Sequence, residues 1–288
     1  MTILENKIDF VMFFTVNGAN PNGDPLNENM PRTDYDGYGE ISDVCIKRKI
    51  RNRMQDLGHS LFVQANDRIN DNMKSLEDRF GAVFKSPKND PDDKVYQVAC
   101  EKWIDVRSFG QVMTFQKRSI GIRGPVSITL AKSLSPVDVI SMQITRSTNG
   151  MSAKEDSGRS SDTMGMKHFV EFGVYKVKGS INPYFAEKTG FTSEDAEIIK
   201  ETLYSLFIND ASSARPEGSM EVKQLYWFTH TSKLGVASSA KVHDLVEIEV
   251  NDNNIKPSKY DDYSISLNKQ KLALLENKGL KVEIFEGL

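Results

Sequence analysis

The chain has 288 residues, of which 39% are hydrophobic and 27% are charged. This composition is typical of a soluble globular protein and excludes a fibrous or largely disordered chain. No apolar run reaches the length of a membrane span. The N-terminus lacks a signal-peptide pattern, and the two cysteines have no CxxC spacing, so a reducing, cytoplasmic compartment is expected.

The charge of the chain is unevenly distributed along its length. The net charge is −3, which by itself disfavours nucleic-acid binding. Residues 43–53 nevertheless carry five cations against one acid, whereas 17 acids face 12 bases from residue 183 onward. Local basic tracts in an acidic chain suit a protein that binds RNA on one face and protein on others.

The first predicted element is a strand over Ile8–Val16, whose residues are apolar on both faces, as in a strand buried on both sides. A segment rich in Asn, Gly, Pro and Asp follows over residues 17–39. Such a segment is too long for a simple connector, so it is either functional or disordered.

Ser42 is a predicted N-cap for a helix over about residues 43–57. Ile46 and Ile50 lie on one face of this helix, which makes it amphipathic. The opposite face is predicted to present three cations to solvent: Lys47, Arg48 and Arg51.

The rest of the chain is predicted to alternate between strands and helices. An inserted subdomain is expected near residues 60–105, with helical spacing from Ile69 to Phe80 and a short helix or irregular segment near Val95–Trp103. The elements predicted after it are a strand at 124–131, a Ser/Gly-rich excursion at 146–166, a strand at 169–177, a helix at 192–209, a strand at 222–230, and short strands at 264–267 and 281–285 around a polar helix.

The order strand, helix, strand, strand, helix, strand is the split βαβ, ferredoxin-like plan. RNA-recognition modules and many unrelated enzymes share this plan, so the fold alone does not decide the function.

Enzymatic constellations are not evident in the sequence. The four histidines have no metal-site spacing, and Walker, GxGxxG and GxSxG motifs are absent, so neither a metal nor a cofactor is expected. Asp34 and Asp36 beside Tyr35 could form a metal-dependent nuclease pair. A turn ending at Gly37 is the favoured interpretation.

The basic helix is the main candidate for binding. A cationic helix face is often only solvated, but these cations are not interleaved with acids at i,i+4 spacing, and they follow a loop that holds Arg32. Loop N–H groups and basic side chains contact phosphates without sequence preference. Arg123 at a strand end and Arg215 in a Gly/Pro turn could extend this path, with ordinary solubility and turn formation as the alternatives.

The excursion at 146–166 has two interpretations. It is either a surface loop or a hairpin arm that reaches across RNA or onto a neighbouring subunit. In the second case its methionines, Met164 and Met166 among them, would form an apolar tip that wedges between bases.

A resemblance to a known family rests on runs spread over nearly the whole chain: FTVNGANPNGDP, MPRTD, GYGEISDVCIKRKIRNR, WIDVRSFGQVM, IRGPVSITLAKSLSPV, MGMKHFVEFGVYKVKGSIN and ARPEGSMEVKQLYWF. These runs resemble the Cas7 family of the RAMP-like superfamily, in its type I-C (Dvulg) branch, which supplies the CRISPR Cascade backbone. The resemblance implies an α+β fold with a modified ferredoxin-like or RRM-like palm at 1–59 and 105–288, a thumb hairpin at about 146–166 and a fingers-like insertion at 60–104.

The family implies a non-catalytic subunit that polymerises along CRISPR RNA and holds it for target DNA pairing in antiviral defence. Its expected partners are CRISPR RNA, target DNA, neighbouring copies of itself, and the large, small and crRNA-processing subunits of Cascade, with no membrane and no cofactor.

The expected RNA-binding residues come from the loop, the basic helix, the thumb and two isolated arginines: Asn20, Asn22, Arg32, Lys47, Arg48, Arg51, Arg123, Met164, Met166 and Arg215. One departure from RNA-recognition modules is that Lys167–Tyr175 lacks their aromatic pattern, so loops and helices are expected to carry the RNA. Two alternatives remain. One is a metal-dependent ribonuclease using Asp24, Asp34 or Asp36. The other is a protein-interaction module whose basic helix binds acidic partners.

Overall fold

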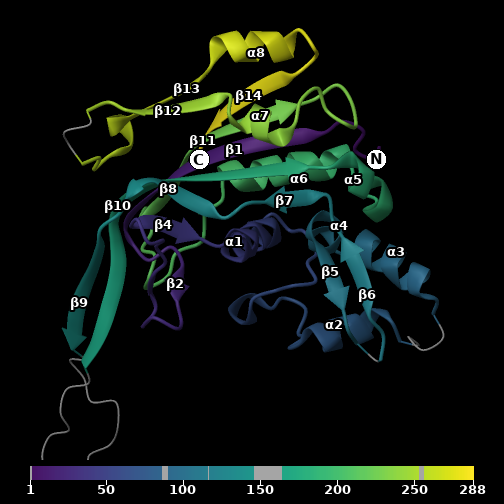
Figure 1. Cartoon of the computed structure of the whole chain (residues 1–288). Helices are drawn as coiled ribbons and strands as arrows, with labels where there is room; N and C mark the ends of the chain where they lie inside the picture. The colour runs from purple at the N-terminus through teal and green to yellow at the C-terminus, as the bar shows by residue number, and fades with distance from the viewer. Residues whose placement is uncertain (1, 86–89, 116, 146–163, 253–255) are drawn as a thin grey trace, which may run out of the picture.

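The computed structural model describes residues 2–85, 90–115, 117–145, 164–252 and 256–288. They form a mixed α+β fold around one eight-stranded antiparallel sheet (Figure 1), which confirms the predicted α+β class. The strands of this sheet are β1 (Ile8–Ala19), β4 (Tyr38–Ile41), β7 (Val126–Ile128), β8 (Ala131–Pro136), β9 (Val139–Thr145), β10 (Met164–Ile181), β11 (Met220–Thr229) and β14 (Lys281–Glu286). The sheet order is β14-β11-β1-β10-β8-β4, and β7 and β9 also pair with β10.

The helices and the small strand pairs surround this sheet. The α-helices are α1 (Asp43–Asp56), α2 (Leu76–Val83), α3 (Asp92–Lys102), α4 (Ile104–Phe109), α5 (Pro183–Thr189), α6 (Ser193–Tyr204), α7 (Ser239–His243) and α8 (Lys269–Glu276). The paired short strands are β2 (Gly23–Asp24) with β3 (Met30–Pro31), β5 (Gly110–Met113) with β6 (Ile120–Arg123), and β12 (Val246–Val250) with β13 (Tyr263–Leu267). No helix in the described part of the chain is long and apolar enough to cross a membrane.

Strand β1 lies in the interior of the sheet and is buried on both faces, as predicted. Phe10 and Phe14 pack with α1 and α6 in one core, whereas Val11 and Phe13 pack in a second core on the other face. A strand between two covered faces needs apolar side chains at every position rather than at alternate ones.

Helices α1 and α6 cover one face of the sheet, and their predicted starts are confirmed. Ser42 caps α1 by accepting a hydrogen bond from the Cys45 amide, and Thr192 caps α6 with a capping box to Asp195. Both caps satisfy amides that a helix start leaves unpaired. Helix α6 ends at Tyr204, five residues before the predicted end.

The opposite face of the sheet is covered by the C-terminal part of the chain. Helix α7, the β12–β13 pair and α8 lie on this side in Figure 1 and enclose the core around Val11 and Phe13. The two predicted short terminal strands and the helix between them are confirmed as β13, α8 and β14. This cover occupies a sheet face that in RNA-recognition modules is open for base stacking.

A separate apolar cluster, which we call the second cluster, lies beside α1 and is built from Phe62, Phe80, Trp103 and Ile122 among others. Its members run from residue 62 to residue 122, so they come from the expected insertion and from the β5–β6 pair after it. The predicted helical spacing over Ile69–Phe80 is wrong for its first half, because α2 begins only at Leu76.

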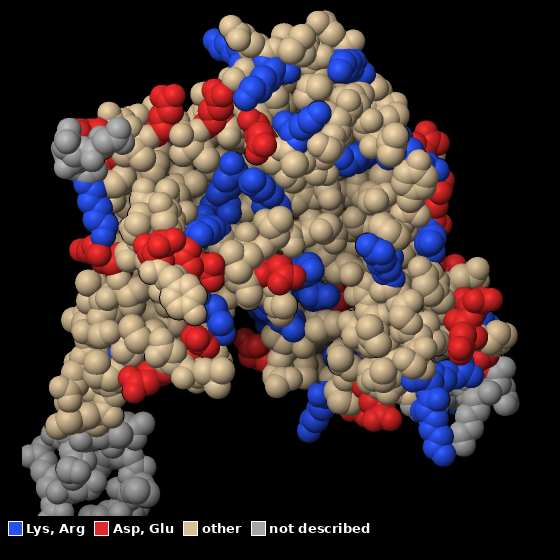
Figure 2. Space-filling view, viewed as in Figure 1, with Lys and Arg blue, Asp and Glu red and all other residues tan. Residues whose placement is uncertain are grey.

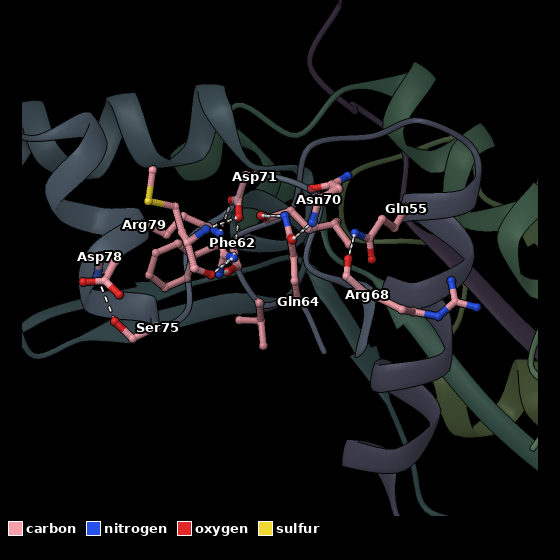
Figure 3. A network of polar contacts seen from close by, with 12 residues as sticks. Gln55, Phe62, Gln64, Arg68, Asn70, Asp71, Ser75, Asp78 and Arg79 are labelled. Atoms are coloured by element: carbon pink, nitrogen blue, oxygen red, sulfur yellow. Dashed lines mark hydrogen bonds and ion pairs between the residues drawn. The ribbon is translucent and has the colours of Figure 1, made fainter. Parts of the chain in front are cut away.

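The segment before α2 is held by polar contacts instead of a helix (Figure 3). Arg79 is buried and donates to both carboxylate oxygens of Asp71, to the Phe62 carbonyl at 2.8 Å and to the Met73 carbonyl at 3.0 Å. A single guanidinium with its planar fork of donors thereby fixes a non-helical loop, and sequence periodicity cannot reveal that.

Two further predictions need correction around the long strand β10. The strand predicted at 124–131 is divided into β7 and β8, and Leu130 between them is 44% exposed. The strand predicted at 169–177 begins at Met164 and pairs with the unpredicted strand β9. Met164 and Met166 therefore lie in a strand and not in an irregular excursion. Residues 146–163 of that excursion lie outside the described residues.

Candidate nucleic-acid interface

The loop after β1 is anchored by Asn20, which is 5% exposed. Its amide donates to the Ala214 carbonyl at 2.9 Å, and its side-chain Nδ2 donates to the Asn29 carbonyl at 2.7 Å. Its Oδ1 is buried without a partner among the described residues. Asn20 thus joins the predicted loop to the turn before β11, two segments that are far apart in the sequence.

Asn22 ties the same loop to the start of α1. Its Oδ1 accepts from the Ser42 amide at 2.9 Å and from the Ser42 hydroxyl at 3.0 Å. Ser42 in turn caps the helix at Cys45. The Asn-rich loop and the helix N-terminus are therefore joined by hydrogen bonds through Ser42.

Arg32 lies at the end of this loop, and its side chain is 39% exposed. One guanidinium nitrogen, Nη2, lies 3.1 Å from Asp24 Oδ1, while Nε is buried without a described partner. Asp24 also accepts from the Leu26 amide at 3.2 Å. Arg32 is thus positioned by Asp24 but keeps donor capacity that the described fold does not use.

Arg215, in the turn before β11, pairs with the same carboxylate as a lysine of α1. Its Nε lies 3.2 Å from Asp210 Oδ2, and this oxygen also pairs with Lys49 of α1. The Arg215 side chain is 28% exposed, whereas the Lys49 side chain is 3% exposed. Arg215 is therefore the more accessible of the two cations that share Asp210.

The Cys45 thiol lies at the start of α1, where its Sγ donates to the Pro21 carbonyl of the loop at 3.5 Å. Burial raises the pKa of Cys45, and the positive charges of Lys49, Arg215 and Arg32 oppose that rise. Three cations from three segments thus act on one atom at the start of α1. The structure brings together four of the predicted site residues here: Asn20, Asn22, Arg32 and Arg215. We call this set the α1-start site.

The cations of α1 are not the free solvent face that the helix pattern predicts. Lys47 pairs with Asp43 at 3.0 Å in an i,i+4 arrangement, so the expectation that acids are not interleaved at this spacing is wrong for this pair. Lys49 is buried against Asp210, and Arg53 Nε donates to the Ser205 hydroxyl at 2.8 Å.

Arg48 and Arg51 point toward the second apolar cluster. Arg51 Nε lies 3.0 Å from Asp105 Oδ2, and Asp105 is fully buried and also accepts from the amides of Phe62 and Val63. Arg48 donates to the Val63 carbonyl at 3.2 Å. Burial lowers the pKa of Arg48, and the charge of Arg51 acts in the same direction.

The second cluster is also fastened to the end of α1. Gln55 Nε2 donates to the Arg68 carbonyl at 2.6 Å, as Figure 3 shows, and Arg68 pairs with Asp56. Both ends of α1 are thus occupied, by the Asn-rich loop at its start and by the 61–70 segment at its end.

Figure 1 shows α1 between the β2–β4 region on one side and α2, β5 and β6 on the other. In the space-filling view a notch cuts into the lower outline between these two regions, and both basic and acidic side chains lie at its walls (Figure 2). A chain-like anion could lie across α1 in this notch.

Two aspartates of the nuclease alternative, Asp24 and Asp34, are engaged in local structure. Asp34 Oδ1 accepts from the amides of Asp36 and Tyr38 at 3.0 and 2.9 Å, and Oδ2 pairs with Lys132 at 2.5 Å. The Lys132 hydrogen bond lowers the pKa of Asp34. Among the described residues no three acidic, His or Cys side chains are grouped as metal ligands.

Arg123 and the two methionines lie away from the α1-start site. Arg123 of β6 stacks over the Phe185 ring at 4.2 Å. Met164 and Met166 are 66% and 51% exposed on the ribbon that β9 and the first part of β10 form. This ribbon projects from the body in Figure 1.

The ribbon carries apolar side chains that the sequence reasoning missed. Met142 and Ile144 of β9 are 51% and 50% exposed, and the register places them on the face opposite Met164 and Met166. The alternation of apolar and polar residues over 140–144 was the available signal for β9. The buried partners Asp105 and Asp210 had no comparable signal.

Comparison with known proteins identifies the family. A family model described as CRISPR-associated protein Cas7 matches residues 6–268. The chain belongs to the Cas7 family. A curated "CRISPR-associated protein Cas7" from Haloferax volcanii is 25% identical over 231 residues, which cover 74% of this chain and 67% of the relative.

Two solved structures are also similar to the chain. One is described as "CRISPR RNA-guided surveillance complex, pre-nicking", with a TM-score of 0.49, 14% identity and coverage of 77% of this chain and 78% of that one. The other is described as "CRISPR RNA-guided surveillance complex", with a TM-score of 0.41, 16% identity and coverage of 77% and 68%.

Proposed function

We propose that this protein is a CRISPR RNA-binding backbone subunit of a Cascade surveillance complex, of type I-C, and that it acts without catalysis in antiviral defence. The observation that carries the proposal is the Cas7 family match over residues 6–268. The quoted sequence runs support the I-C branch, and the engagement of Asp24 and Asp34 in turns and ion pairs supports a non-catalytic role.

The α1-start site is the part of the chain that we assign to the RNA backbone. Arg32 and Arg215 are partly exposed, lie near the same thiol and come from loops that are tied to the helix start. Such groups attract phosphates without reading bases. Lys47 and Arg48 would contribute across α1, whereas Arg51 is held by the buried Asp105 and would act mainly through its charge. Met164 and Met166 would act on base stacking from the ribbon.

The architecture proposed for this role is a modified ferredoxin-like, RRM-like palm with a thumb hairpin at about 146–166 and a fingers-like insertion at 60–104. The strand order β11-β1-β10, with β7 and β8 beyond β10, and the helices α1 and α6 on one face support the ferredoxin-like plan. Copies of the chain would then line up along the RNA, beside the large, small and crRNA-processing subunits, and leave the RNA free to pair with target DNA.

Co-purification of RNA tests the proposal. The chain should purify with bound RNA and form oligomers, seen as excess absorbance at 260 nm and a large elution size. Arg32→Ala/Arg215→Ala should retain much less of this RNA, and the salt slope of log affinity should fall by about 0.7 for each phosphate that the variant no longer neutralises. A chain that purifies free of nucleic acid and does not bind added single-stranded RNA would refute the proposal. Cleavage of bound RNA with Mg²⁺, abolished in Asp34→Ala, would instead favour the ribonuclease.

A further inference from the structure

The face of β10 that points away from α1 carries two lysines. Lys176 and Lys178 are two positions apart, so their side chains share one face of the strand, about 6.6 Å apart. Their partners on β1 are Phe13 and Val11, which belong to the core beneath α7 and β12–β13. Lys176 and Lys178 therefore lie on the opposite side of the sheet from α1.

These two lysines lack the ion pairs that the cations of α1 have. Neither Lys176 nor Lys178 forms an ion pair with a carboxylate of the described residues. Asp244, which follows α7, is the acid whose charge reaches Lys176. His243 donates to the Gly179 carbonyl at 3.0 Å and lies close enough to both lysines to feel their charge.

The cation opposite Lys176 in the register is already paired with an acid. Lys132 of β8 is directly opposite Lys176, and it pairs with Asp34 at 2.5 Å. Glu40 lies opposite Lys132 in the register, and its charge acts on Lys132 together with those of Asp34 and Asp36. Asp244 is the acid whose charge acts on Lys176 itself. In the space-filling view Lys and Arg side chains gather near the centre of the displayed face, below the C-terminal elements (Figure 2).

The fold disfavours the charged form of Lys176, the more strongly affected of the two lysines. Burial lowers the pKa of Lys176 to about 8, the charge of Lys178 adds to this shift, and Asp244 opposes it without cancelling it. An anion bound between the two ammonium groups would remove the repulsion and restore the solvation that burial takes away.

The chemistry of lysine indicates which anion fits. Each ammonium is a compact charge with three donors and no fixed plane, and lysine binds phosphates in this way, as a point charge. We propose that Lys176 and Lys178 form a second contact for a nucleic-acid backbone, on the side of the sheet opposite the α1-start site. This inference rests on the proposed function, because that function places nucleic acid against the chain.

The experiment uses the full chain stripped of co-purified nucleic acid, with a fluorescent single-stranded RNA of random sequence as the probe. Lys176→Met/Lys178→Met is compared with Lys269→Met/Lys271→Met on α8, which removes the same charge, at the same spacing in the sequence, from exposed positions. We expect the first variant to bind about 5–10-fold more weakly, with a salt slope lower by about 1.4, since each phosphate of a single strand contributes about 0.7. The α8 variant should stay within about twofold of the unmodified chain.

A spectroscopic readout separates binding from a change of fold. Lysines carrying a ¹³C-methyl label report their own titration, and the resonance assigned to Lys176, by its disappearance in Lys176→Met, should titrate near pH 8 in the free chain. Addition of the RNA should move this midpoint upward, toward the ordinary value of 10.5. An unmoved midpoint together with equal affinities of the two double variants would overturn the inference.

Other outcomes also decide the question. Loss of self-association by Lys176→Met/Lys178→Met with unchanged RNA affinity would overturn the inference and indicate an acidic protein surface as the partner. Weaker binding by Arg32→Ala/Arg215→Ala alone would overturn only the second contact and leave the proposed function intact. Absence of RNA binding by the unmodified chain would overturn both.

Discussion

The cations of α1 and the lysines of β10 are both basic clusters in the sequence, but the fold treats them in opposite ways. On α1, Lys49 and Arg51 meet carboxylates that are buried with them. On β10, Lys176 and Lys178 share a face with each other and form no ion pair with the described residues. Whether a cation belongs to the scaffold or is available to a ligand thus depends on whether it has a carboxylate partner. The number of cations close together in the sequence does not decide it.

The largest effect expected from this comparison is at Asp105. Asp105→Ala leaves the Arg51 charge and the amides of Phe62 and Val63 without their acceptor. Loss of one partner of a buried pair costs about 3–5 kcal/mol, so we expect a decrease of this size in the free energy of urea unfolding. Asp105→Asn, which keeps one acceptor oxygen, should lose less. Equal stability of Asp105→Ala and the unmodified chain would show that this ion pair does not hold the second cluster to α1.

A smaller effect is expected at Lys49, because its partner has a second cation. Lys49→Met leaves Asp210 paired with Arg215 and should cost about 1–2 kcal/mol in urea unfolding. Asp210→Ala leaves both cations without their carboxylate, so it should lower the free energy of unfolding more than Lys49→Met does. The reverse order of the two variants would contradict the shared-carboxylate geometry.

The charge of Lys176 on β10 should destabilise the folded chain, in contrast to the ion-paired charges of α1. The pKa of Lys176 is lowered to about 8 in the folded chain, whereas the unfolded chain keeps the ordinary value of 10.5. Between these two values the unfolded chain holds the proton that the folded chain has released, so this lysine makes stability rise with pH over that window. Below about pH 8 both states are protonated, and the cost of the buried charge is fully present.

Lys176→Met should therefore raise the Tm at pH 7 by about 1–3 °C and flatten the rise of stability above pH 8. Thermal melts at a series of pH values measure both changes, and Lys269→Met provides the matched control. A lower Tm for Lys176→Met at pH 7 would contradict this prediction and show that the contact of the ammonium with the Phe13 ring, 5.7 Å from its centroid, outweighs the cost of the buried charge.

The smallest effect on stability is expected at the ribbon. Met164→Ser/Met166→Ser removes exposed side chains and should change the unfolding free energy by less than about 0.5 kcal/mol. If the ribbon acts on base stacking, the fluorescence of 2-aminopurine in bound RNA should fall, because the base returns to the stack. Met142→Ser/Ile144→Ser on the opposite face is the control that shows which face meets the RNA. Unchanged fluorescence in both variants would refute the wedge.

Local signals in the sequence were sufficient for several elements. A run of apolar residues predicts β1, and one capping residue each predicts the starts of α1 and α6. Each of these signals lies within a few positions of the element. The 69–75 segment was misassigned as helical because its apolar spacing is overridden by Arg79, whose hydrogen bonds to Asp71 and to two carbonyls fix a loop. Tertiary contacts routinely override such weak local preferences.

The sequence by itself determined the Asn-rich loop, the capped helix behind it and the buried central strand, because each depends on residues close together in the chain. Only the tertiary structure decided which cations are free. Arg51 finds Asp105 at a separation of 54 residues, and Lys49 finds Asp210 at a separation of 161. Charge pairing depends on distance in space, and that distance is set by how the sheet, α1 and the second cluster pack against one another.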